Sequence, residues 1–298
     1  MKKIFFFLFF LLCISFCYAK KKITVPDDVK IIEQSYPDLK IEYSFDKKLN
    51  DWLLKIQFPD KEETVSLYWC GGSLLPEEEL ENKEKYWTLL YDYPEILQDP
   101  ADMTEEEKES LKNFTSSENR KNGAGTPPFF FDLFYSADTK ASLEKQLVKV
   151  TFLGKNSTVH KYIKEPLKKV EEKIYALYKT DTDVKNFVDG LKSADAYYWR
   201  RIEGTNRKSF HSYGIALDII PKRYTGEAFW SWARDHNPKG WILTPLKRRW
   251  LPAQKVIEAF ESEGFIWGGK WAIWDNMHFE YHPEIINFNK KYKWGENQ

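Results

Sequence analysis

A histidine and an aspartate lie seven residues apart in the segment SFHSYGIALDII, which spans residues 209–220. The chain has only five histidines, and His211 is one of them. Asp218 stands between two apolar residues, where a carboxylate is costly to bury unless it is hydrogen-bonded or paired with a cation. A divalent metal bound by both residues would meet that requirement. The segment therefore predicts part of a metal site.

A second segment, WDNMHFEYH at residues 274–282, supplies further ligand types. If MHFEY is a strand, His278 and Glu280 project to the same side of it, and Asp275 can reach the same cavity from a turn just upstream. Together His211, Asp218 and His278 provide two nitrogens and one oxygen, a set that suits zinc. Three protein ligands leave a fourth position for water, as a catalytic zinc site requires.

The other three histidines, His160, His236 and His282, are predicted to be solvated or capping residues. His282 is nearest to His278 in sequence and is the strongest competitor for the metal. Four residues along a strand correspond to about 13 Å, however, which is too far for both side chains to bind one metal without a bend.

Neither a helix nor a straight strand accounts for the spacing of His211 and Asp218. Gly214, the β-branched isoleucines and Pro221 disfavour a continuous helix. A straight strand would send side chains seven residues apart to opposite faces. We expect a turn through SYG that reverses the chain and leaves His211 at the mouth of a strand, IALDII.

Helices and short strands are predicted to alternate around these segments. Apolar residues recur every three or four positions in residues 159–179, which is typical of an amphipathic helix. A second helix is predicted over residues 184–194, and a third over residues 252–264, with proline near its start and glycine at its end. The predicted strands are QLVKVTFLG, GIALDII and MHFEYH.

Residues 20–127 differ in character from the rest of the chain. LLKIQF and TVSLYWCGG are predicted strands, the second with a Gly-Gly turn. Residues 100–128 are rich in polar residues and predict a linker or mobile loop whose acidic run is a solvated helix face. Cys70 could be a soft metal ligand, but a lone buried cysteine is more often a small hydrophobe. We find no catalytic motif in this part, and its fold stays open at this point.

The first 19 residues have the layout of a secretory signal. Two lysines precede an apolar run from Ile4 to Phe16, and Ala19 offers a small-residue cleavage site. The run is short for a membrane-spanning helix, so an uncleaved anchor is the less favoured alternative. A lipid at Cys17 is another alternative. Cleavage would leave Cys70 as the only cysteine, so a structural disulfide is not expected within the mature chain.

Composition disfavours one class of partner. The chain has 298 residues, with 45 Lys and Arg balanced by 45 Asp and Glu. A formal net charge of zero gives no electrostatic reason to bind a polyanion, so nucleic acid is not expected as a partner.

Two motifs resemble a known peptidase family. The pattern SxHxxGxAxD at residues 209–218 and the segment GFIWGGKWAIWDNMHFE at residues 264–280 look like the zinc D-alanyl-D-alanine carboxypeptidase family of the VanY type. That family also includes L-alanyl-D-glutamate endopeptidases of bacteria and phages. The resemblance covers the C-terminal part of the chain, including YYWRRIEGTNRKSFHSYG, and says little about residues 20–127.

The resemblance implies that His211, Asp218 and His278 hold Zn²⁺ and that Asp275 is the general base. Many relatives carry a glutamate where this chain has Asp275, and the shorter side chain resembles the endopeptidase and VanY-like branch. The implied fold class is α+β, a small central antiparallel sheet with flanking helices. That fold is shared in outline with hedgehog-type domains, and here it follows an N-terminal region of unknown fold.

The chemistry of the residues fits these roles. Zinc lowers the pKa of a bound water to about 7, and a carboxylate such as Asp275 can take the proton of that water. Arg200 is the preferred group for stabilising the oxyanion, with Arg201 as the alternative. Ser209 and Glu280 are expected to orient the metal ligands or to contact the substrate.

We therefore expect a signal peptide at residues 1–19, an N-terminal region at 20–127 and a zinc peptidase domain at 128–298. The expected function is that of an exported metallopeptidase of the periplasm or cell envelope that hydrolyses peptidoglycan stem peptides, as a D-alanyl-D-alanine carboxypeptidase. An L-alanyl-D-glutamate-type endopeptidase is one alternative. A non-catalytic zinc-stabilised module that binds cell wall or protein is another, and the carboxylate of Asp275 favours an enzyme.

Overall fold

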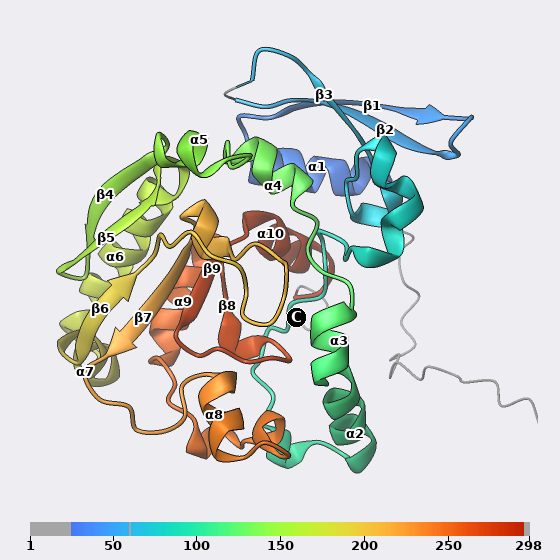
Figure 1. Ribbon diagram of the computed structural model, residues 1–298. Helices are drawn as coiled ribbons and strands as arrows, with labels where there is room; N and C mark the ends of the chain where they lie inside the picture. Colours follow the sequence, from blue (N-terminus) through green and yellow to red (C-terminus); the bar gives the residue numbers. More distant parts are fainter. Residues whose placement is uncertain (1–24, 60, 295–298) are drawn as a thin grey trace, which may run out of the picture.

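The structure is a computed structural model that describes residues 25–59 and 61–294 (Figure 1). The predicted signal peptide and the lipid alternative at Cys17 fall outside these residues. Within them, no helix combines the length and the apolar character that crossing a bilayer requires.

A four-stranded antiparallel sheet forms the centre of the C-terminal part. Its strands run in the order β6-β7-β9-β8. Their bounds are β6 (Leu191–Asp195), β7 (Ala216–Pro221), β8 (Phe265–Trp267) and β9 (His278–Tyr281). The predicted strands GIALDII and MHFEYH are thus confirmed, as is the α+β class with a small antiparallel sheet.

Three amphipathic helices flank this sheet. They are α6 (Lys164–Tyr178), α7 (Thr182–Asp189) and α9 (Gln254–Ser262), and α6 packs against both of the others (Figure 1). The apolar face predicted for α6 is buried at Leu167, Val170 and Ile174. The prediction for residues 184–194 was too long: the helix ends at Asp189 and β6 follows directly after Gly190. Leu191 and Ala194 pack in the core as strand residues, which explains the difference.

A β-hairpin lies beside the edge of the central sheet. It consists of β4 (Leu147–Phe152) and β5 (Lys155–His160), and β5 packs against β6. The tight turn uses Leu153 and Gly154, both with positive φ. The strand predicted at residues 146–154 is confirmed.

The N-terminal part has a helix and a sheet of its own. The helix α1 (Val25–Ser35) precedes a three-stranded antiparallel sheet of β1 (Lys40–Asp46), β2 (Asp51–Gln57) and β3 (Val65–Tyr68). The helix α1 packs against the C-terminal helix α10 (Pro283–Tyr292) (Figure 1). One hydrophobic cluster includes Ile32 and Leu54 together with Phe288, so the core is continuous between the two parts of the chain.

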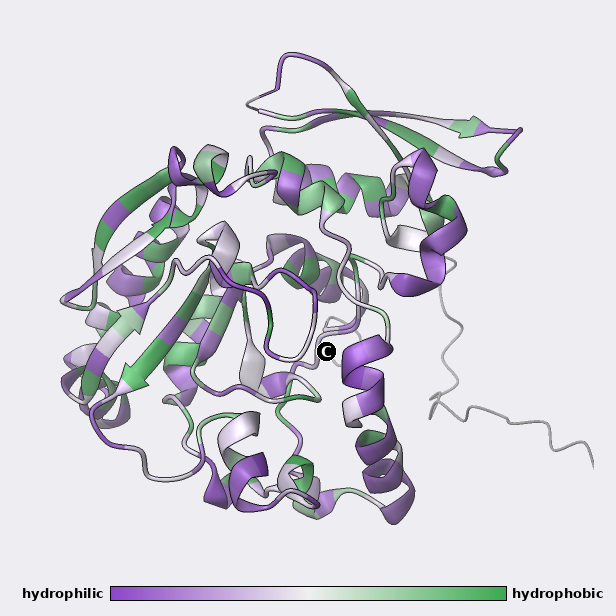
Figure 2. Ribbon diagram, in the orientation of Figure 1, coloured by the Kyte–Doolittle hydropathy of each residue, from purple (hydrophilic) through white to green (hydrophobic). Residues whose placement is uncertain are grey.

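The segment predicted as a linker is largely helical. It contains α2 (Glu105–Phe114) and α3 (Ser117–Asn122). Thr104 and Glu107 form a capping box at the start of α2, a local signal that outweighs the polar composition. The acidic side chains of α2 do face solvent, as expected, and both helices are largely hydrophilic in Figure 2.

Shorter helices complete the structure. They are α4 (Phe129–Phe134), α5 (Lys140–Glu144) and α8 (Trp230–His236). Turns of 3₁₀ helix occupy Cys70–Gly72, Glu77–Lys85, Pro100–Asp102, Lys161–Ile163, Phe210–Tyr213, Trp241–Leu243, Leu246–Arg248 and Gly268–Lys270. The cysteine at the start of the first turn, Cys70, is partly buried and carries a free thiol.

Candidate metal site

The pairing of β7 with β9 brings an aspartate and a histidine together. Asp218 on β7 lies directly opposite His278 on β9 in the antiparallel register. Directly opposed residues project to the same face of a sheet, with Cβ atoms about 5 Å apart. The register therefore places two of the three predicted ligands side by side, although they are 60 residues apart in sequence.

A short turn brings the third predicted ligand to the same place. His211 lies in the 3₁₀ turn Phe210–Tyr213, which ends at Gly214 with φ of 70°. A Cβ at Gly214 would come within 2.8 Å of Leu147 Cδ2 and 2.9 Å of the backbone nitrogen of His160, so a larger residue does not fit. The reversal predicted through SYG is confirmed, and it leaves His211 beside the start of β7.

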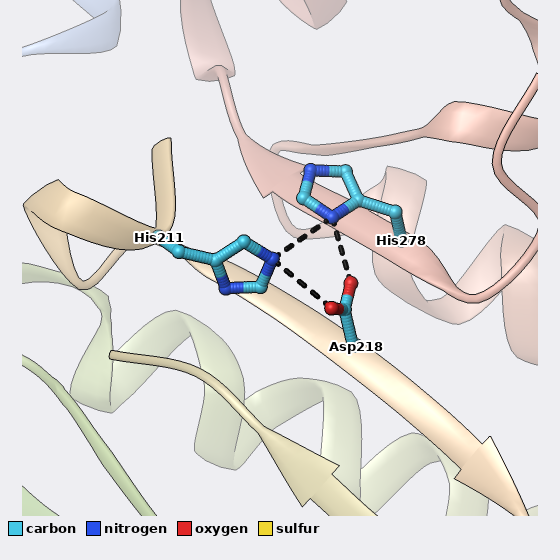
Figure 3. Close-up of side chains that lie close together, drawn as sticks. All are labelled: His211, Asp218 and His278. Atoms are coloured by element: carbon cyan, nitrogen blue, oxygen red, sulfur yellow. Dashed lines mark hydrogen bonds and ion pairs between the residues drawn. The ribbon is translucent and has the colours of Figure 1, made fainter. Parts of the chain in front are cut away.

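The three side chains converge at donor-atom distances that one metal ion can bridge (Figure 3). Nδ1 of His278 lies 2.8 Å from Oδ1 of Asp218. Nε2 of His211 lies 3.2 Å from Oδ2 of Asp218 and 3.2 Å from Nδ1 of His278. Tetrahedral zinc binds nitrogen and oxygen ligands at about 2.0–2.2 Å, which separates neighbouring donors by a little more than 3 Å.

The second nitrogen of each imidazole is already held. Nδ1 of His211 lies 2.5 Å from the carbonyl oxygen of Ala196, and Nε2 of His278 lies 2.7 Å from Oε1 of Glu280. A carbonyl or ionised carboxylate accepts the ring N–H of the outer nitrogen, so the inner nitrogen would present its lone pair to a bound metal. Two imidazoles held in this way, together with one carboxylate, form a donor set that fits Zn²⁺.

The charge state of Asp218 also suits a cation. Burial raises the pKa of Asp218, but the hydrogen bonds from His211 and His278 outweigh burial and hold the pKa well below its usual value. The carboxylate is thus ionised at neutral pH and can act as an anionic ligand.

Asp275 lies beside this cluster in a setting expected of a catalytic carboxylate. Burial raises its pKa, His278 lowers it and the charge of Asp218 raises it, and the net result is a pKa of about 7. Its Oδ1 atom is buried and has no hydrogen-bond partner among the residues that the structure describes. A buried acceptor without a partner costs about 1–3 kcal/mol, so its retention favours a role toward a bound water or substrate.

An open groove of about 880 Å³ reaches two of the three converging residues. The strands β4, β5 and β6 and the segment after β6 line it, and His211 and Asp218 lie in its wall. Arg200 also lines this groove, whereas the guanidinium of Arg201 donates to the carbonyl oxygen of Asn206. Of the two arginines considered, Arg200 is the one that lines the groove.

Ser209 and Glu280 both contact the predicted ligands. The hydroxyl of Ser209 accepts a hydrogen bond from the backbone N–H of His211 at 3.4 Å and caps the 3₁₀ turn. Ser209 therefore positions the turn, and Glu280 positions the imidazole of His278.

The prediction of solvated or capping residues is confirmed for His236 and His160 and is wrong for His282. His236 is solvated, as expected, with 62% of its side chain exposed. His160 does cap the turn that follows β5, but it is buried rather than solvated, with Nε2 lying 3.2 Å from the carbonyl oxygen of Tyr135. His282 is also buried and lies between the carboxylates of Glu280 and Glu284. The alternation HxExHxE at residues 278–284 was the sequence signal for this arrangement. His278 and Glu280 share one face of β9 because they are two residues apart, and His282 and Glu284 follow at the start of α10.

Comparison with known proteins supports the assignment from the motifs. Residues 203–281 match a family profile described as D-alanyl-D-alanine carboxypeptidase, and residues 28–91 match a profile described as a domain of unknown function. A relative from Bacillus subtilis (strain 168), the peptidoglycan L-alanyl-D-glutamate endopeptidase CwlK, is 34% identical over 77 residues. The alignment covers 26% of this chain and 41% of that protein, and no solved structure matches.

The profile match at residues 203–281 contains His211, Asp218, Asp275 and His278. Over this segment, the chain is similar to the D-alanyl-D-alanine carboxypeptidase family and to the endopeptidase of B. subtilis, and the match spans less than half the length of that relative.

Proposed function

We propose that this protein is a zinc-dependent peptidase that hydrolyses a peptide bond in the stem peptide of peptidoglycan. The observation that carries the proposal is the convergence of His211, Asp218 and His278 beside a buried carboxylate, Asp275, whose pKa burial raises to about 7. Two imidazoles and one carboxylate would hold zinc and leave a position for water. A base with a pKa near the working pH is well suited to proton transfer.

Each residue has a distinct role in the proposed reaction. Zinc bound by the three ligands would make a water nucleophilic at neutral pH. Asp275 takes the proton of the attacking water on its unpaired Oδ1 atom and passes it to the leaving amine. Arg200 stabilises the negative charge that develops on the carbonyl oxygen, since it is the arginine that lines the groove. Glu280 keeps the imidazole of His278 in one tautomer and orientation.

Two cleavage positions are consistent with this chemistry. A D,D-carboxypeptidase removes the terminal D-alanine, as the description of the matching family suggests. An L-alanyl-D-glutamate endopeptidase cuts within the stem, as the name of the B. subtilis relative suggests. The groove, at about 880 Å³, is near the upper end of the range of ~300–1,000 Å³ for ligand pockets, which supports a substrate longer than a dipeptide.

The remaining expectations belong to the same proposal. Export to the periplasm or cell envelope depends on the signal-like residues 1–19. The division at residue 127, with a peptidase domain at 128–298 and a hedgehog-like arrangement of its sheet, also stays a proposal. A zinc-stabilised binding module without activity is the second candidate, and the unpaired, buried Oδ1 atom of Asp275 is the observation that disfavours it.

The direct test is mass spectrometry of disaccharide-pentapeptide muropeptides after incubation with the protein and zinc, with and without a chelator. Loss of one alanine that the chelator blocks supports a D,D-carboxypeptidase. Separation of the stem after its first alanine supports the endopeptidase. If zinc is bound at one equivalent and every muropeptide stays intact, the binding module replaces the peptidase as the better proposal.

A further inference from the structure

A line of buried hydrogen bonds runs from His278 away from the groove. Nε2 of His278 lies 2.7 Å from Oε1 of Glu280, and Oε2 of Glu280 lies 3.3 Å from Nε2 of His282. Nδ1 of His282 lies 2.7 Å from Oε1 of Glu284. The hydroxyl of Tyr36 donates a hydrogen bond of 2.6 Å to Oε2 of Glu284. The line thus crosses from β9, through the start of α10, to the end of α1.

Donors and acceptors alternate along this line without a break. A carboxylate oxygen accepts hydrogen bonds, and Glu280 and Glu284 each use both of their oxygens in the line. His282 faces a carboxylate with each ring nitrogen, and only an imidazolium donates from both. Burial lowers the pKa of His282, but the charges and hydrogen bonds of Glu284 and Glu280 outweigh burial and raise that pKa to about 9. His282 is therefore a cation held between two carboxylates.

The line is shielded from water along its length. Tyr36 and Glu284 are each 2% exposed, His282 is 3% exposed and Glu280 is 8% exposed. In surroundings of low dielectric constant, hydrogen bonds are stronger and polarise one another. A change at one end of such a network is felt at the other end more strongly than it would be in water.

The two ends of the line belong to different parts of the chain. Tyr36 lies within residues 28–91, which match a domain of unknown function, whereas His278 lies within the peptidase segment. Tyr36 and Glu284 are 248 residues apart in sequence. The N-terminal part therefore contributes a side chain to the hydrogen bonds behind the candidate metal site.

We propose that Tyr36 is a positioning residue for the metal site. Its hydroxyl holds Glu284, which acts through His282 and Glu280 to fix the orientation and basicity of the His278 imidazole. The inference rests on the proposed function only in that His278 binds zinc. It gives the N-terminal region a role in completing the peptidase site from behind the sheet.

The test compares Tyr36→Phe with a matched control, Tyr93→Phe. Tyr93 is also 2% exposed, and its hydroxyl also donates a hydrogen bond of 2.6 Å to a glutamate, Glu261. It lies outside the line. The Tyr93 hydroxyl also accepts a hydrogen bond of 2.9 Å from the backbone N–H of Trp267, so Tyr93→Phe is expected to lose at least as much stability in urea unfolding as Tyr36→Phe.

The readouts are zinc affinity by competition with a chromophoric chelator, the visible spectrum of the Co²⁺-substituted protein, and the ring ¹⁵N shifts of His278. We expect Tyr36→Phe to weaken zinc binding about 3- to 10-fold and to change the spectrum and the shifts. Tyr93→Phe should leave all three as in the parent. Equal zinc affinity, spectra and shifts in the two variants and the parent overturn the inference.

Two further measurements keep the result decisive. If Tyr36→Phe does not fold, Glu284→Gln is measured in its place with the same readouts and the same criteria. If the parent binds no zinc, the proposed function fails, but the ¹⁵N shifts of His278 in the metal-free variants still decide the inference.

Discussion

Replacing Asp275 by asparagine should lower the activity of the protein and raise its stability at neutral pH. Asparagine keeps the size of the side chain but cannot accept a proton, so we expect turnover to fall by ~10²–10⁴-fold, the usual contribution of general acid-base catalysis. Burial raises the pKa of Asp275 from 3.8 to about 7 in the metal-free protein. At 1.36 kcal/mol per pKa unit, the ionised carboxylate destabilises the fold by up to about 4 kcal/mol.

The sign of the pH dependence follows from the raised pKa. The folded state holds the proton of Asp275 more tightly than the unfolded state, so this residue does not oppose folding below pH 3.8. Its penalty grows as the pH rises from 3.8 and is complete above about 7. Asp275→Asn carries no such penalty, so the variant should gain stability over the parent as the pH rises.

The assay is urea unfolding of metal-free parent and Asp275→Asn at pH 4 and pH 8, together with muropeptide turnover and zinc content at pH 8. We expect the stability difference to shift in favour of the variant by a few kcal/mol between the two pH values, with zinc content close to that of the parent. A variant that turns over as fast as the parent refutes Asp275 as the base. A stability difference that does not change with pH refutes the burial argument.

Three further outcomes follow from the geometry. His211→Ala should bind zinc more than about 100-fold more weakly, because a direct ligand is lost rather than a supporting hydrogen bond. Unchanged zinc content by atomic absorption would show that His211 is not a zinc ligand. Gly214→Ala should cost at least about 1–2 kcal/mol in urea unfolding, since φ is 70° and the new Cβ meets Leu147 Cδ2 at 2.8 Å; a variant as stable as the parent contradicts this. The raised pKa of His282 should add on the order of 3 kcal/mol to the free energy of unfolding below pH 6.5, and this contribution is lost as the pH rises through about 9. The measurement is the urea midpoint of the parent and of His282→Gln over that pH range. If the two midpoints fall in parallel, His282 is not the cause of the loss.

Local patterns in the sequence predicted the elements around the site well. The helix over Leu167, Val170 and Ile174 was visible from its apolar period, and the strand of Asp218 from its β-branched residues and the glycine before it. These are properties of neighbouring residues and need no tertiary information. The linker prediction was wrong because it relied on composition and ignored the capping residues of the segment that forms α2 and α3.

Electrostatic context was harder to predict. The distance along a strand was a sound reason to exclude His282 as a partner of His278 on one metal, but it gave no information about what His282 does. Its role depends on Glu284 and, through it, on Tyr36, which no local pattern connects to the metal site. The pKa of Asp275 likewise depends on its burial and on the charges of Asp218 and His211, which are distant in sequence.

The sequence by itself determined which donor atoms are present, because residue types and short spacings are local: two imidazoles and a carboxylate on a turn and two strands, with a second carboxylate nearby. Only the tertiary structure decided that Asp218 pairs with His278 across β7 and β9 and that Arg200 lines the groove. It also decided that a tyrosine of the N-terminal part ends the hydrogen-bond line. Register, burial and partners of this kind arise from packing between segments that are far apart along the chain, and the free energy of that packing is not contained in any one segment.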